Sequence, residues 1–185
     1  MILGKGIRLR AVEHDDLPRF AAWLNDPEVR ENLLVYAPLS LDDEQGWYEG
    51  MRKRPKDEQP LVMEIKTEDG WQAIGNIGLH DLSWRHRCAE VGLFIGEKDL
   101  WSKGYGRRFL RLMLRHAFQT LNLNRVYLHV YETNLRGIRS YEKAGFVHEG
   151  RLRQAIFSNG RYIDLLVMSA LREEWHDQDE SYIME

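Results

Sequence analysis

The chain has 185 residues, enough for one domain of ordinary size with a substantial core. Hydrophobic residues make up 43% and charged residues 30%, which is typical of a globular protein, and the net charge of −3 provides no basic field for nucleic acid. No apolar run reaches membrane-spanning length, no secretory signal is recognisable, and the single Cys88 excludes an internal disulfide and a cysteine zinc cluster. We therefore expect a cytoplasmic protein with no metal, no nucleic-acid partner and no membrane contact.

The first third of the chain predicts one strand and two helices. Residues 6–12 alternate between apolar and polar side chains and predict a strand. A helix follows from the acidic residues 13–16 and ends before Pro27. Ser40, with Asp43 three residues later, predicts the N-cap of a second helix that runs to about residue 54.

The middle of the chain predicts a hairpin, a strand and a helix. Residues 61–66 and 71–79 are expected strands, joined by the hairpin signal Asp69-Gly70. Residues 88–95 form a third apolar run, and a helix is expected over 103–120. The apolar residues of this helix recur at helical spacing: Phe109, Leu110, Met113, Leu114 and Ala117.

The last third predicts a strand over 125–131 and a short helix over 135–143, capped by Asn134 and ended by Gly145. Two final strands, over 146–157 and 162–170, flank the turn Ser158-Asn-Gly160. The pattern therefore predicts an α/β (α+β) fold, a mixed sheet of about seven strands with helices on both faces. We expect a single domain over residues 1–175 and an acidic, flexible tail over residues 176–185.

A glycine-rich loop joins the strand over 88–95 to the helix that follows it. Its sequence is Trp101-Ser-Lys-Gly-Tyr-Gly-Arg-Arg108, and Ser102 is the expected helix cap. The first amides of a helix lack partners and lie at the positive end of the helix dipole, so three nearby cations would oppose that dipole. An anion such as a pyrophosphate would account for both features. A helix that simply begins after a glycine loop explains them equally well.

Two other nucleotide-binding patterns fit poorly. The P-loop pattern requires a longer glycine spacing that ends in Gly-Lys-Ser/Thr, which the chain lacks. The dinucleotide fingerprint requires a third glycine where Phe109 stands, and Glu132 matches its ribose-binding acid only loosely. Dinucleotide binding therefore remains a second hypothesis.

The glycine loop resembles the acyl-CoA-binding motif of the GCN5-related N-acetyltransferases (GNAT), Gln/Arg-x-x-Gly-x-Gly/Ala. Further along, Glu132-Thr-Asn134 and Ser140-Tyr-Glu-Lys-Ala-Gly-Phe146 are similar to the second motif of that superfamily, in matching order. The resemblance extends from about Ile7 to Trp175. Trp101 departs from the motif's Gln or Arg, a change that a cradle built from main-chain amides tolerates.

Within the superfamily, the chain looks most like the ribosomal-protein N-terminal acetyltransferases and the spermidine acetyltransferases. The segments 145–153 and 159–164 carry this closer likeness. The resemblance implies acetyl-CoA as cosubstrate, and a homodimer is an assembly that rests on family likeness alone. It also implies that Asn134 holds the arm or the acetyl region and that Tyr141 is the general acid at the thioester sulfur. The implied main-chain contacts are Leu93, Phe94 and Ile95 for the pantetheine arm, and Ser102, Lys103, Gly104, Tyr105, Gly106 and Arg107 for the pyrophosphate.

Acetyl transfer to an amine requires a neutral amine, an aligned thioester and a stabilised thiolate. A lysine-type amine has a pKa of about 10.4 and an α-amino group a pKa of about 8, so the α-amino acceptor needs less help from a base. Glu90 and His80, at strand ends, are the candidate bases, and both are also consistent with ordinary surface residues. Glu90 is alternatively a binding group for a cationic amine, and Tyr141 has the alternative of packing beside Ile138 and Phe146.

These expectations combine into an acetyl-CoA-dependent N-acetyltransferase that uses direct transfer. The expected acceptor is the α-amino group of a protein or peptide, with a polyamine or another small amine as the alternative. A non-catalytic acyl-CoA-binding sensor of the same fold remains an alternative of another class.

Overall fold

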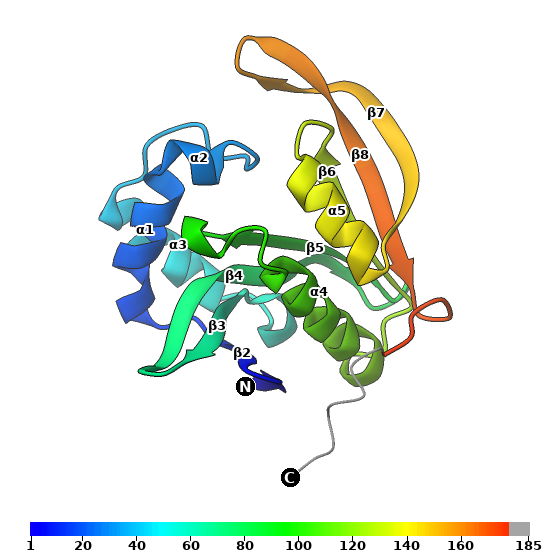
Figure 1. The fold of residues 1–185 in the computed structure, drawn as a ribbon, viewed down its shortest axis with the longest axis horizontal. Helices are drawn as coiled ribbons and strands as arrows, with labels where there is room; N and C mark the ends of the chain where they lie inside the picture. The colour runs from blue at the N-terminus through cyan, green and yellow to red at the C-terminus, as the bar shows by residue number, and fades with distance from the viewer. Residues whose placement is uncertain (178–185) are drawn as a thin grey trace. The chain divides into compact units, whose positions relative to one another are not determined.

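The computed structural model describes residues 1–177, which form a mixed α/β fold on one open sheet (Figure 1). Its strands and α-helices, in chain order, are β1 (Ile2–Gly4), β2 (Ile7–Ala11), α1 (Leu17–Asn25), α2 (Pro27–Arg30), α3 (Leu41–Arg52), β3 (Leu61–Thr67), β4 (Gly70–Ser83), β5 (Cys88–Ile95), α4 (Tyr105–Arg115), β6 (Arg125–Tyr131), α5 (Leu135–Ala144), β7 (Val147–Ser158) and β8 (Arg161–Leu171). The predicted α/β class is confirmed.

The eight strands lie in the order β1-β2-β3-β4-β5-β6-β8-β7. The β5–β6 pair is parallel, and the pairs β1–β2, β2–β3, β3–β4, β6–β8 and β7–β8 are antiparallel. The sequence pattern predicted about seven strands and missed β1. Its three residues are too few to show an alternation, and only the turn at Gly6, with φ of 66°, brings it back onto β2.

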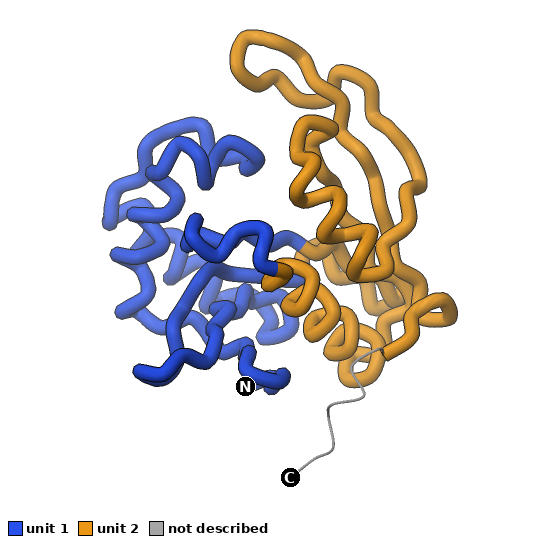
Figure 2. Tube along the Cα trace, in the orientation of Figure 1, with its two compact units in different colours: residues 1–79, 92–103 blue, residues 80–91, 104–185 orange. Residues whose placement is uncertain are grey.

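The chain divides into two compact units, coloured separately in Figure 2. Unit 1 contains residues 1–79 and 92–103, and unit 2 contains residues 80–91 and the chain from residue 104. The single domain expected over 1–175 stays a prediction. The expected tail begins at His176, and from residue 178 onward it lies outside the described residues.

Unit 1 has an apolar core between its helices and its strands. The core cluster consists of Val12, Leu17, Phe20, Trp23, Val29, Tyr48, Met51, Val62 and Ala73. The predicted capping box of α3 is confirmed, because the Asp43 amide donates to Ser40 Oγ at 3.1 Å and the Ser40 amide donates to the Asp43 carboxylate at 2.8 Å. A bulge at Met63/Glu64 shifts the pairing of β3 with β4.

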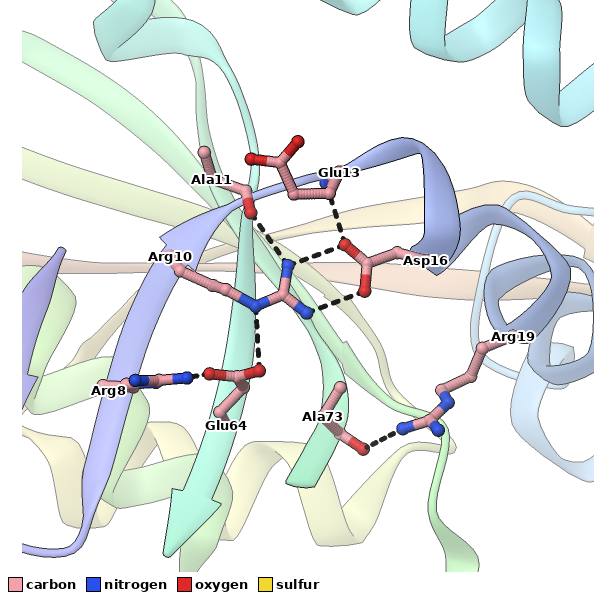
Figure 3. A network of polar contacts seen from close by, with 8 residues as sticks. All are labelled: Arg8, Arg10, Ala11, Glu13, Asp16, Arg19, Glu64 and Ala73. Atoms are coloured by element: carbon pink, nitrogen blue, oxygen red, sulfur yellow. Dashed lines mark hydrogen bonds and ion pairs between the residues drawn. The ribbon is translucent and has the colours of Figure 1, made fainter. Parts of the chain in front are cut away.

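A polar network ties β2 and β3 to the turn before α1 (Figure 3). Arg10 donates to both carboxylate oxygens of Asp16 at 2.7 Å and to Glu64 at 2.8 Å, while Arg8 donates to the other oxygen of Glu64. Burial opposes ionisation of Asp16, but hydrogen bonds from Arg10 and from the Glu13 amide outweigh it and lower the pKa of this carboxyl. The network therefore fixes the start of α1 on the sheet.

Unit 2 is built on β6, which pairs with β5 on one side and along its whole length with β8 on the other. The predicted apolar face of α4 is confirmed, since Phe109, Leu110, Met113, Leu114 and Ala117 are all buried. The helix predicted over 103–120 is shorter as an α-helix, because α4 begins at Tyr105 and passes after Arg115 into a π-helical turn, His116–Thr120. The predicted cap and stop of α5 are confirmed. The Gly137 amide donates to Asn134 Oδ1 at 2.9 Å, and Gly145 has φ of 105°.

Within residues 1–177, no helix combines the length and the apolar character needed to cross a membrane. The same residues contain no group of three or more His, Cys, Asp or Glu side chains arranged to hold a metal ion.

Candidate active site

The start of α4 presents main-chain amides that the helix itself does not use. The first α-helical hydrogen bond of α4 runs from the Arg108 amide to the Gly104 carbonyl at 3.2 Å, so the amides of Tyr105, Gly106 and Arg107 precede the helical ladder. No acid lies in this first turn, and cations stand there instead. An anion is the ligand that both the free amides and the cations favour.

The prediction that Ser102 caps α4 is wrong. The N-cap is Gly104, with φ of 85° and no side-chain cap, and Ser102 itself has a left-handed φ of 61°. The cap fails because the chain makes two left-handed turns before the helix begins, so Ser102 lies outside the capping position. The cofactor contact expected for Ser102 concerns its main-chain amide and stays a prediction, as do the contacts of Lys103 and Gly104.

The second half of β5 supplies main-chain groups next to this loop. The ladder of β5 with β6 contains three pairs and ends at Glu90–Tyr127, although β5 continues to Ile95. The Phe94 carbonyl faces β4, because a Cβ added at Gly75 would lie 2.1 Å from its oxygen. Successive residues of a strand direct their amides to opposite edges, so Leu93 and Ile95 direct theirs away from β4. Of the three expected arm contacts, these two fit best.

Tyr141 lies on α5 and is half-buried, with its ring edge-on to Phe146 at a centroid distance of 6.0 Å. Burial raises the pKa of the Tyr141 phenol to about 12. The phenol therefore keeps its proton at neutral pH, as a proton donor requires. At the start of the same helix, the side-chain oxygen of Asn134 caps the amide of Gly137, which leaves its NH₂ group as the donor for a ligand.

Glu90 is paired with His129, a residue that lies outside the sequence motifs. His129 Nδ1 lies 2.7 Å from Glu90 Oε1, and the ring of Tyr127 stands edge-on to His129 at 5.9 Å. Glu90 and Tyr127 are register partners, and His129 lies two residues further along β6, so the three side chains share one face of the sheet. Burial, followed by the charges of Glu90 and Asp81, raises the pKa of Tyr127. The face thus combines a carboxylate, an imidazole and an aromatic ring, and the Arg125 guanidinium lies 5.6 Å from the centroid of that ring.

The signal for His129 was present in the alternation along β6. Val126, Leu128 and Val130 are buried, which assigns the odd-numbered residues to the opposite face. The contact of His129 with Glu90 was not predictable, because the pairing of β5 with β6 creates it and the spacing along the chain does not indicate it. His80, the other candidate base, was expected at the end of a strand, but β4 continues to Ser83, so His80 lies half-buried within the strand. Its role as a base stays a prediction.

One family model, described as an acetyltransferase (GNAT) domain, matches residues 7–147. The chain belongs to the GNAT acetyltransferases. It is 32% identical to a spermidine N(1)-acetyltransferase of Vibrio cholerae over 177 residues, which cover 94% of this chain and 98% of that one. It is 35% identical over 104 residues to a putative ribosomal N-acetyltransferase, YdaF, of Bacillus subtilis, which covers 56% of each chain.

A crystal structure of the spermidine N-acetyltransferase from Vibrio cholerae, in complex with CoA and spermine, superimposes with a TM-score of 0.82 at 30% identity. The superposition covers 92% of this chain and 98% of the Vibrio cholerae chain. This GNAT protein is an N-acetyltransferase with acetyl-CoA as cosubstrate. These findings favour an enzyme over the sensor alternative and displace the dinucleotide hypothesis.

Proposed function

We propose that this GNAT enzyme acetylates a small aliphatic amine of the polyamine class. The observation that supports this acceptor best is the likeness to a spermidine acetyltransferase, which extends over nearly the whole of both chains. The likeness to the putative ribosomal acetyltransferase covers about half of each chain. The relatives thus favour the small-amine alternative over the α-amino group of a protein, which was the first expectation from the sequence.

The face that carries Glu90 has the chemistry that a polyamine requires. Such an amine is an ammonium ion at neutral pH, with a pKa of about 10, so it must be held by anions and then lose a proton. Glu90 provides a carboxylate on this face, and the charge of Asp81 acts on the Tyr127 ring beside it. That ring already attracts one cation, the Arg125 guanidinium, which lies 5.6 Å from its centroid. We assign the Glu90–His129 pair as the acceptor of the ammonium proton, since a carboxylate orients the imidazole beside it.

Tyr141 acts on the second reactant, acetyl-CoA, as the proton donor to the thioester sulfur. The deprotonated amine nitrogen forms a bond to the acetyl carbon, the carbon–sulfur bond breaks, and the sulfur takes the phenol proton of Tyr141. The second proton that the nitrogen loses as it becomes an amide restores the phenol. The raised pKa keeps that proton available before the step. Alignment of the two reactants supplies much of the remaining rate enhancement.

The cofactor is assigned to main-chain groups of β5 and of the α4 start. Leu93 and Ile95 extend the sheet toward the pantetheine arm, and the amides from Ser102 to Arg107 take the diphosphate. The donor set fits a diphosphate, because it combines unused helical amides with the cations Lys103 and Arg107.

An acceptor panel tests the proposal. The purified protein is mixed with acetyl-CoA and with spermidine, spermine, a monoamine or short peptides with free α-amino groups, and release of the CoA thiol is followed. We expect kcat/KM for the polyamines to exceed that for the peptides by at least about tenfold, the effect of one additional ion pair. Equal or higher kcat/KM on peptides would overturn the polyamine assignment and restore the protein N-terminus.

A further inference from the structure

Trp101 joins the loop before α4 to the end of β5. Its indole Nε1 donates to the Ile95 carbonyl at 2.8 Å, and its main-chain amide donates to the Lys98 carbonyl at 3.0 Å. The half-buried ring packs against the core cluster of unit 1, which includes Phe20 and Trp23. One side chain thus connects the strand, the loop and the core.

Two other side-chain contacts hold the beginning of this loop. Trp23 Nε1 donates to Glu97 at 3.2 Å, and Lys98 Nζ lies 2.7 Å from Asp26 Oδ2. A Cβ added at Gly96 would lie 2.1 Å from the Trp23 ring, so the backbone there rests directly on the indole. Trp101 is the anchor that directly precedes the residues expected to face the diphosphate.

The backbone after Trp101 is held in an unfavourable conformation. Ser102 has φ of 61° and Gly104 has φ of 85°, and a non-glycine residue adopts the left-handed region only at a cost in free energy. Left-handed residues that alternate with others turn successive amides toward one side, which creates a concave anion site. Such a conformation persists only where neighbouring contacts fix it, and the anchored indole of Trp101 is the adjacent contact.

We propose that Trp101 is a positioning residue for the diphosphate of CoA. Its N–H bond to Ile95 sets the direction in which the chain leaves β5, and this direction sets the left-handed turn at Ser102. The inference rests on the cofactor assignment above and is independent of the acceptor. Trp101 acts here through the backbone and does not need to touch the cofactor.

The substitution Trp101→Phe keeps an aromatic ring in the core and removes only the N–H donor. We expect the Kd for CoA, measured by calorimetry, to rise about five- to tenfold, the effect of one neutral hydrogen bond. At saturating acetyl-CoA, kcat is expected to stay unchanged. The KM for acetyl-pantetheine, which lacks the diphosphate, is also expected to stay unchanged, because the strand contacts remain.

The matched control is Trp71→Phe, which alters an indole stacked on Arg8 at 4.3 Å in the β3–β4 hairpin and should change none of these constants. An unchanged Kd for CoA in Trp101→Phe would overturn the inference. The inference would also be overturned if Trp101→Phe weakened the Kd for CoA and the KM for acetyl-pantetheine equally, with or without a lowered melting temperature. Either result would indicate an ordinary core tryptophan. Normal CoA affinity in Gly104→Val would instead remove the cofactor assignment itself.

Discussion

At the scale of single residues, the phenol of Tyr141 makes the sharpest chemical prediction. Tyr141→Phe should lower kcat about 10²-fold or more, because the leaving sulfur loses its proton donor, while the Kd for CoA stays unchanged. Since the pKa of Tyr141 is raised to about 12, the wild-type rate should show no alkaline decline centred on the ordinary phenol pKa of about 10. Steady-state kinetics from neutral to alkaline pH measure both effects. Tyr162→Phe, at the exposed hairpin tip, is the control, and unchanged kcat in Tyr141→Phe would remove the acid role.

The pair of Glu90 and His129 makes a prediction about coupling. Each of Glu90→Gln and His129→Asn should lower kcat/KM for the amine by about 10²-fold, and Glu90→Gln should shift the pH–rate profile. Because the two side chains share one hydrogen bond of 2.7 Å, the double variant should lose little more than either single one. A double-mutant cycle on kcat/KM, with CoA affinity as the control, measures this coupling. Fully additive losses would show that the two residues do not act together.

At the scale of elements, the start of α4 depends on a left-handed glycine. Gly104→Val should abolish CoA binding or weaken it strongly, because a β-branched residue disfavours φ of 85° and its methyl groups would approach the diphosphate. Calorimetry with CoA measures the loss, and circular dichroism checks the fold. Gly46→Val in α3, where an added Cβ meets open space, is the matched control and should bind CoA normally.

The edge strand β7 is held to its neighbours by the carboxylate of Glu149. Glu149 accepts hydrogen bonds from Arg125 of β6 and from Ser169 of β8, and these bonds lower its pKa from 4.5 to about 2. A lowered folded-state pKa contributes stability above the unfolded-state value, and this contribution is lost as the pH falls from about 4.5 to about 2. Urea unfolding at several pH values should therefore find Glu149→Gln less stable than wild type at pH 6 and equal to it near pH 2. A constant difference across that range would contradict the assignment.

At the scale of the whole molecule, the strong periodic segments were predictable from the sequence. The runs that became β5, β6 and α5 were placed to within one residue, because each combines an apolar period with a turn or cap at its end. The four-residue α2 and the three-residue β1 were not predicted, because such short segments show no hydrophobic periodicity. Single-residue backbone angles were not predictable either, because no local pattern indicates that Ser102 has a left-handed φ of 61°.

The site was predictable where it consists of consecutive residues and unpredictable where the sheet assembles it. The amides at the α4 start and the Tyr141 segment lie within short motifs, so the sequence indicated them. His129 stands 39 positions from Glu90, and only strand pairing brings the two together. No motif distinguishes an α-amino acceptor from a polyamine, and the proposed polyamine acceptor rests on the relatives.

The path of the chain between its two units has a consequence for recombination. The backbone changes units after residues 79, 91 and 103, because β4 and β5 each belong partly to both. A fragment that ends at residue 79 would lack Phe94 and Trp101, which pack on its own core cluster. Exchange of either unit between homologous enzymes therefore requires three crossover points, and a single splice in the gene would divide the cores of both parents.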